Sequence, residues 1–131
     1  MKKDIENEDD IKLLVDSFYG GARQDEVIGY IFNDIIGDDW SHHMPVMYGF
    51  WKSVLFNAGG YTGNVIKKHL DVDRKIAFQQ AHYDRWIKLW NETVDSLFEG
   101  EIAELAKNKA FLMIKLIGMK VEMARLGNNI M

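Results

Sequence analysis

The segment FQQAHYDRWIKLWNETVDSL, residues 78–97, predicts a long amphipathic helix and points to an all-helical fold. Its apolar and aromatic residues recur at intervals of three and four, which places them on one face of a helix. That face carries Phe78, Ala81, His82, Trp86, Leu89, Trp90, Thr93, Val94 and Leu97. The pattern stops at Glu99-Gly100, so we expect the helix to end there and its apolar face to pack against other helices.

Four other segments show the same helical spacing, over residues 11–22, 27–36, 40–55 and 102–124. Asn7 is predicted to cap the first, Gly37 to end the second, and Arg125-Leu126-Gly127 to end the last. A shorter helix is expected over residues 65–70, ending near Asp73, which would cap the following helix. No segment alternates as a strand does, so the sequence predicts one all-α domain over residues 1–131.

Two features within these helices call for a structural explanation. Gly20-Gly21 interrupts the first helix at about 1 kcal/mol per glycine relative to alanine, so we expect another helix to cross closely there. Pro45, the only proline, lacks an N–H and must lie in the first turn of its helix or kink it.

The composition excludes several classes of protein. Apolar residues make up 47% and charged residues 27% of the chain, and no apolar run reaches the roughly 18 residues of a membrane span. The N-terminus lacks the apolar stretch of a signal peptide, so a cytoplasmic location is expected. A net charge of -4 without a basic stripe argues against a nucleic-acid partner.

The absence of cysteine narrows the choice of metal ligands. Disulfides, iron–sulfur clusters and thiolate-bound zinc or haem are excluded, which leaves histidine as the leading candidate. His69 lies in VIKKHL, residues 65–70, just after the glycine-rich NAGGYTG, residues 57–63. A histidine on the inner face of such a short helix can hold a haem iron. The aromatic segments before and after it favour haem over a bare metal.

Four stretches occur in an order that resembles the truncated haemoglobins, specifically the bacterial group III. They are Phe18-Tyr19, the segment from His43 to Phe50-Trp51, Lys67-Lys68-His69-Leu70, and Arg85-Trp86-Ile87-Lys88-Leu89-Trp90. The resemblance spans nearly the whole chain and implies a two-over-two helical sandwich around haem b. Pro45, close after His43, departs from the family pattern.

The resemblance also implies roles for four polar residues. His69 matches the proximal ligand of the iron, and Tyr19 and Trp86 match polar residues of the distal side. His43 matches the histidine of the distal helix, where it would add a third donor or act as a ligand gate. A globin-type iron needs one neutral imidazole, whose second nitrogen donates to a carbonyl or carboxylate. A phenol and an indole donor in an apolar pocket favour oxygen over carbon monoxide.

Further residues are expected around the cofactor. By the same resemblance, Phe18 and Phe50 match aromatic positions that pack near the porphyrin. Phe32 and Met47 are expected to line the pocket. Lys68, next to His69, is expected to pair with the haem propionates.

The predicted function is therefore binding of oxygen, nitric oxide or carbon monoxide at a five-coordinate haem iron. Oxygen carriage and the detoxification of nitric oxide or peroxide both fit, and turnover would need an external reductase. Two alternatives stay open. A non-haem helical metalloenzyme would need Glu-x-x-His pairs or a His-Glu-x-x-His motif, and the sequence has neither. A cofactor-free helical interaction protein would use the aromatic residues only for packing.

Overall fold

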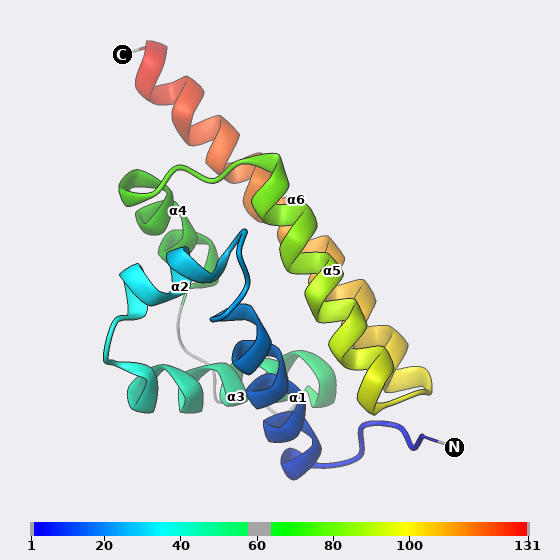
Figure 1. Cartoon of the computed structure of the whole chain (residues 1–131). Coiled ribbons are helices and arrows are strands. Elements are labelled where there is room, and N and C mark those ends of the chain that lie inside the picture. Colours follow the sequence, from blue (N-terminus) through cyan, green and yellow to red (C-terminus); the bar gives the residue numbers. More distant parts are fainter. Residues whose placement is uncertain (1, 58–63, 131) are drawn as a thin grey trace.

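The structure is a computed structural model that describes residues 2–57 and 64–130, with side chains as far as Gly127. Within these residues the chain forms six helices and no strand (Figure 1): α1 (Glu8–Ala22), α2 (Gly29–Ile36), α3 (Trp40–Phe56), α4 (Val65–Lys75), α5 (Gln80–Leu97) and α6 (Glu101–Ile130). The predicted all-α class is confirmed. The glycine-rich stretch at residues 58–63 lies outside the described residues. None of the described helices is long and apolar enough to cross a bilayer.

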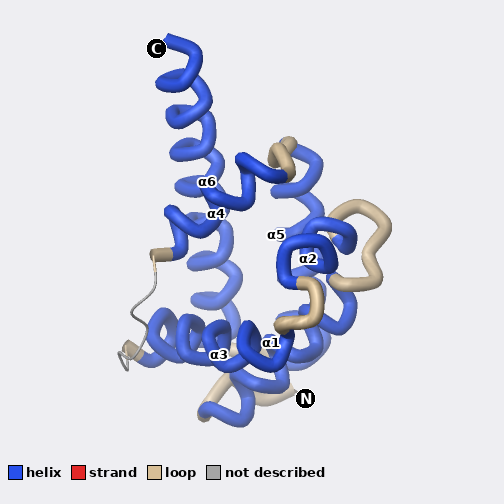
Figure 2. Tube along the Cα trace, turned by 90° about the vertical axis from the view of Figure 1, so that its left-hand side faces the viewer, coloured by secondary structure: helices blue, strands red, loops and turns tan. Residues whose placement is uncertain are grey.

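Two pairs of helices form the body of the molecule. α5 and α6 run side by side in opposite directions, and α1 packs against both α3 and α5. The pair α1–α3 therefore lies on the pair α5–α6 as the predicted two-over-two sandwich. Figure 2 shows α4 and α6 on one side of the centre and α2 and α5 on the other, with α1 and α3 below.

Aromatic side chains join the two pairs. Trp90 of α5 is 1% exposed, stacks on Trp51 of α3 with ring centroids 4.3 Å apart, and donates from Nε1 to the carbonyl of Ala106 at 3.2 Å. Phe18 of α1 meets Trp90 edge to face at 5.2 Å. Large buried rings contribute strongly to core stability, so these contacts fix how α1, α3 and α5 face one another.

The glycine pair in α1 does not mark a close helix crossing. α1 continues through Gly20 and Gly21, and a Cβ atom at either position would meet no other described residue within 4 Å. Both glycines are exposed, whereas Phe18, Tyr19 and Ala22 on the same helix are buried. The prediction of tight packing was wrong because burial of the other face holds α1 helical without a crossing helix at the glycines.

Pro45 lies inside α3 rather than at its start. The helix begins at Trp40 and continues past the proline to Phe56. In its first turn the N–H groups of His42 and His43 both bond to the carbonyl of Asp39, at 3.2 and 3.0 Å. Pro45 itself is exposed, and the helix accommodates the loss of one donor.

Two residues predicted to end helices bind each other instead. α4 extends to Lys75, beyond its predicted end near Asp73, and α6 extends to Ile130, beyond the predicted end at Arg125-Leu126-Gly127. The guanidinium of Arg125 donates to the Asp73 carboxylate at 2.5 Å and to the carbonyl of Phe78 at 2.7 Å. Asp73 also accepts from the N–H of Phe78 at 2.8 Å. These polar side chains hold α4 to α6, and both helices continue past them.

Candidate functional site

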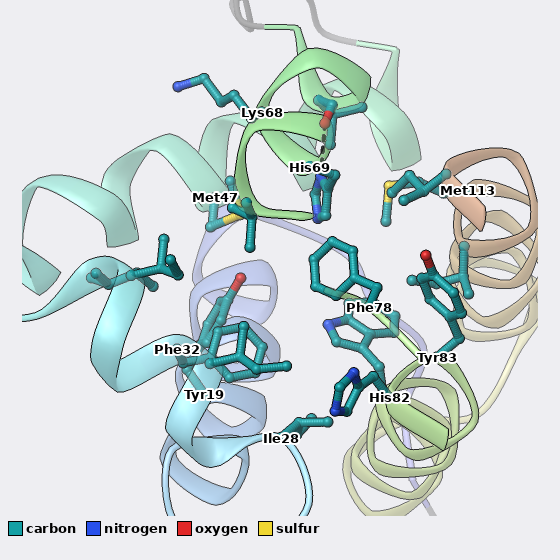
Figure 3. A pocket seen from close by; sticks show the side chains of 18 of the residues that line it. Tyr19, Ile28, Phe32, Met47, Lys68, His69, Phe78, His82, Tyr83 and Met113 are labelled. Carbon is teal, nitrogen blue, oxygen red and sulfur yellow. Dashed lines mark hydrogen bonds between the residues drawn. The ribbon is translucent and has the colours of Figure 1, made fainter. Parts of the chain in front are cut away.

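A cavity of about 260 Å³ lies at the centre of the sandwich, and all six helices contribute to its wall. Its lining is mainly aliphatic and aromatic, from residues such as Ile31, Phe32, Val72, Met113 and Ile117. Figure 3 shows side chains from opposite walls pointing toward one another across this space. An apolar cavity with a few polar groups is the usual form of a small-ligand site, so the polar groups decide what it binds.

His69 projects from α4 into the cavity (Figure 3). Its Nδ1 lies 2.7 Å from the carbonyl oxygen of Val65, one turn earlier in the same helix. Because a carbonyl only accepts, Nδ1 must carry the proton, which leaves a lone pair on Nε2. Burial lowers the pKa of His69, against the smaller opposing effect of the Val65 hydrogen bond. His69 therefore presents a neutral imidazole in the tautomer that a metal ligand requires.

Tyr19 faces the cavity from α1, and its hydroxyl points into the space (Figure 3). Four aromatic rings surround it, among them Phe18 at 5.1 Å and Phe32 at 5.4 Å between centroids. Its hydroxyl makes no hydrogen bond to any other described residue. Burial raises the pKa of Tyr19. The residue is thus a protonated phenol held in one position, with its donor free for a ligand.

His43 lies beside Tyr19 on α3, with ring centroids 5.3 Å apart, and also lines the cavity. Its Nε2 is buried and has no hydrogen-bond partner among the described residues. Burial lowers the pKa of His43, and the nearby charge of Lys68 lowers it further. An unpaired buried polar atom is costly, so this neutral imidazole is suited to meet a polar group of a ligand. Pro45 does not move His43 away from the cavity.

Trp86 of α5 is a further polar residue of the cavity wall. Its ring stacks on Trp90 at 5.5 Å between centroids and meets Phe18 edge to face at 5.0 Å. The indole lines the cavity, and its N–H donates to no other described residue. The packing of these rings fixes Trp86 before any ligand arrives.

An ion pair next to Trp86 ties this wall together. The Arg85 guanidinium donates to the Asp25 carboxylate at 2.8 and 2.9 Å, and the Asp25 side chain is only 5% exposed. Asp25 also accepts from the N–H groups of Val27 and Ile28 in the connection that leads to α2. The hydrogen bond from Arg85 is the main reason why the pKa of Asp25 is lowered. The pair thereby anchors the α1–α2 connection to α5.

Comparisons with known proteins agree with this geometry. No family model matches the chain. A curated protein named Group 3 truncated hemoglobin ctb, from Campylobacter jejuni, is 32% identical over 113 residues, which cover 84% of this chain and 87% of that protein. The crystal structure of a group III truncated haemoglobin from Campylobacter jejuni matches with a TM-score of 0.80 and 30% identity, covering 89% of this chain and 92% of that one.

The chain belongs to the group III truncated haemoglobins. Membership in this globin family brings a haem cofactor and a diatomic gas ligand, which favours the haem interpretation over both alternatives. Following the roles expected from the sequence, we name the wall that carries His69 the proximal wall, and the wall that carries Tyr19, His43 and Trp86 the distal wall.

Most of the predicted site residues of this truncated haemoglobin line the one cavity. Besides the four polar groups, the lining includes Phe32, Met47, Phe50 and Lys68. Lys68 is exposed, and Figure 3 shows its amino group pointing away from the centre. Phe18 is the exception, since it is 1% exposed and does not line the cavity. It packs against Tyr19 and Trp86, whose side chains do line the cavity.

Several lining residues had no predicted site role, among them Phe78, His82, Tyr83 and Met113. His82 is 9% exposed, accepts from the N–H of Gln79 at 3.0 Å, and has its Nε2 3.1 Å from the Tyr30 hydroxyl. Its position four residues before Trp86 was a usable signal, because residues one turn apart share a helix face. Phe78 lies just before the start of α5, but it lines the same cavity as His82 and Trp86, with which the helical spacing had grouped it.

Proposed function

We propose that this globin binds haem b in the central cavity, with Nε2 of His69 as the protein ligand of the iron. The observation that carries the proposal is the hydrogen bond from His69 to the Val65 carbonyl. It holds the imidazole in the ligand tautomer and turns it toward an apolar cavity with three polar side chains on the far wall. When bound, the haem supplies an iron with one position open to a diatomic gas.

Lys68 and the apolar lining residues also fit a haem. A porphyrin requires a flat apolar space, and its propionates require cations near the surface. Lys68 lies at the cavity wall with its amino group exposed, and it makes no ion pair with any described residue. We assign it to a propionate. Phe32, Met47 and Phe50 would contact the porphyrin or the ligand from the distal side.

The distal wall favours a ligand that becomes polarised when it binds. The Tyr19 hydroxyl, the Trp86 indole and His43 are all neutral groups that can donate or share a hydrogen bond, and the rings around them exclude water. Such fixed donors in an apolar site stabilise polarised oxygen far more than carbon monoxide. We infer slow oxygen release, which suits conversion of nitric oxide or peroxide, with an external reductant, better than bulk carriage.

The test is the rate of oxygen release from the reduced, haem-loaded protein, measured by stopped flow. Tyr19→Phe removes one donor and should speed release by roughly 10- to 100-fold, because hydrogen bonds to charged groups contribute about 1.5–3 kcal/mol. Tyr48→Phe is the matched control, since the Tyr48 hydroxyl bonds to Asp16 and Tyr48 does not line the cavity. Equal release rates in wild type and Tyr19→Phe would remove Tyr19 from this role. Negligible nitric oxide consumption with oxygen and a reductant present would count against the detoxification proposal.

A further inference from the structure

α6 carries a second apolar face that the fold does not use. Leu112, Leu116, Met119, Met123 and Leu126 are between 45% and 63% exposed. We call these five residues the outer stripe. They follow one another at steps of four, three, four and three residues, which is the spacing of the buried seam in a coiled coil. Isolated exposed apolar residues are ordinary, but five leucine and methionine side chains in this register form one continuous strip.

The face of α6 that packs on the globin lies on the other side of the helix. Ala110, Ile117 and Val121 are at most 2% exposed, and each is two residues from a member of the outer stripe, about 200° around the helix. The outer stripe is therefore not an edge of the core. The last turns of α6 also extend beyond the other helices (Figures 1 and 2), which leaves room for a long neighbour.

The charges beside the outer stripe indicate which neighbour fits. Lys115 and Glu122 lie along one flank and Lys120 along the other. All three side chains are exposed, and none makes an ion pair with a described residue. If a second copy of α6 packs in parallel, Lys115 meets Lys120 of the second copy, and like charges repel. In the antiparallel arrangement Lys115 meets Glu122 of the second copy, and two-fold symmetry repeats this ion pair.

We propose that the outer stripe pairs antiparallel with the outer stripe of a second copy of this chain. In this arrangement Leu116 packs against Met119 of the second copy and Leu112 packs against Met123 of the second copy. A two-fold axis near residues 117–118 produces each contact twice. A stable dimer usually buries about 800 Å² per partner, and an apolar strip of a few hundred Å² is at the upper end of what monomers expose. The pairing is therefore weak and reversible.

Sedimentation velocity of the haem-loaded full chain over a wide concentration range tests this proposal. Wild type should pass from the 15.2 kDa monomer to a dimer as concentration rises. Met119→Glu introduces a charge at an exposed position, so it should keep the protein monomeric without unfolding it. Leu13→Glu is the matched control, because Leu13 is an exposed leucine on α1 at 49%, and it should dimerise as wild type does. Far-UV circular dichroism checks that each variant is folded.

The charge pair tests the orientation. Lys115→Glu should weaken dimerisation about tenfold, a typical size for a close charge reversal. The double variant Lys115→Glu/Glu122→Lys should restore it, because the pair is rebuilt with its signs exchanged. A wild type that stays monomeric at millimolar concentration overturns the proposal, as does a Met119→Glu protein that still dimerises. Monomers that instead bind phosphatidylcholine/phosphatidylserine vesicles through the same face would also overturn it.

Discussion

The two walls of the cavity hold their functional residues in different ways. On the distal side, Tyr19 belongs to a helix with seven buried residues, and Trp86 stacks within the aromatic core. On the proximal side, no residue of α4 is fully buried, and His69 is half-buried against the cavity. Its histidine is oriented by one hydrogen bond within the helix, and Asp73 ties the helix to Arg125 of α6. The distal wall is thus organised by packing, whereas the proximal wall depends on a few directed bonds and on the cofactor.

Each wall has one Asp–Arg pair that joins two segments. Asp25 and Arg85 tie the α1–α2 connection to the helix that carries Trp86. Asp73 and Arg125 tie α4, which carries His69, to α6. If the two walls differ as described, loss of the first pair should affect ligand kinetics, and loss of the second should affect retention of the haem.

The largest effect is expected from His69→Ala. If His69 is the protein ligand of the iron, as proposed, haem loss should accelerate by more than the roughly 100-fold that is typical for changes behind a metal ligand. Transfer of haem to an excess of apomyoglobin measures this rate, and added imidazole should partly restore the ligand. His42→Ala is the control, because His42 is the exposed neighbour of His43. Unchanged haem retention in His69→Ala would show that the proximal assignment is wrong.

Arg125→Gln should loosen the proximal wall alone. It removes the bonds to Asp73 and Phe78, which should lower the free energy of unfolding by about 1–2 kcal/mol, since the guanidinium is partly exposed. Haem loss should be faster, whereas oxygen release from the haem-loaded fraction should match wild type. Urea denaturation and the haem-transfer assay measure the two effects. Faster oxygen release without faster haem loss would reverse the proposed roles of the walls.

Arg85→Gln should reveal the distal pair through its dependence on pH. The pKa of Asp25 is lowered in the folded state, mainly by Arg85. As pH falls, the unfolded chain therefore binds more protons than the folded chain does. The stabilisation is complete above the ordinary carboxyl pKa of about 3.9 and is lost as pH falls through the lowered pKa. Wild type should therefore lose more stability than Arg85→Gln between about pH 6 and pH 3. If urea denaturation shows the same change in the free energy of unfolding with pH for both proteins, this pair is not a source of stability.

The smallest effect is expected from Gly20→Ala. The position is helical, exposed and free of described neighbours within 4 Å, so alanine should stabilise α1 by about 0.5–1 kcal/mol. Oxygen release should stay unchanged, because the buried face with Tyr19 is untouched. Thermal denaturation measures the gain. A loss of stability would mean that the exposed face of α1 has a role beyond forming the helix.

Helical periodicity was sufficient to predict that three polar side chains face the interior, whereas their distal role rests on the family resemblance and stays a prediction. Tyr19, His43 and Trp86 lie on long apolar stripes, and a residue on such a stripe faces the interior whichever partner it meets. His69 was found by its residue type and neighbours in the sequence. A hydrogen bond from its second nitrogen to a carbonyl or carboxylate was expected, but the sequence did not reveal that the acceptor is the carbonyl of Val65.

The tertiary connections could not be read from local patterns. Asp73 and Arg125 are 52 positions apart and each resembles a helix-end signal, so only their meeting in space reveals their role. Asp25 and Arg85 are 60 positions apart and belong to no periodic stripe. Gly20-Gly21 was misinterpreted because a crossing helix was expected to offset the low helix propensity of glycine. Burial of other residues of α1 offsets it instead.

The absorbance spectrum of the reduced haem-loaded protein, before and after carbon monoxide, tests the central claim most directly. The account predicts a five-coordinate ferrous spectrum that converts fully to a six-coordinate one with the gas, because His69 alone binds the iron and the distal side stays open. Two results would contradict it: a preparation with no Soret band despite ample haem, or a six-coordinate spectrum before any gas is added.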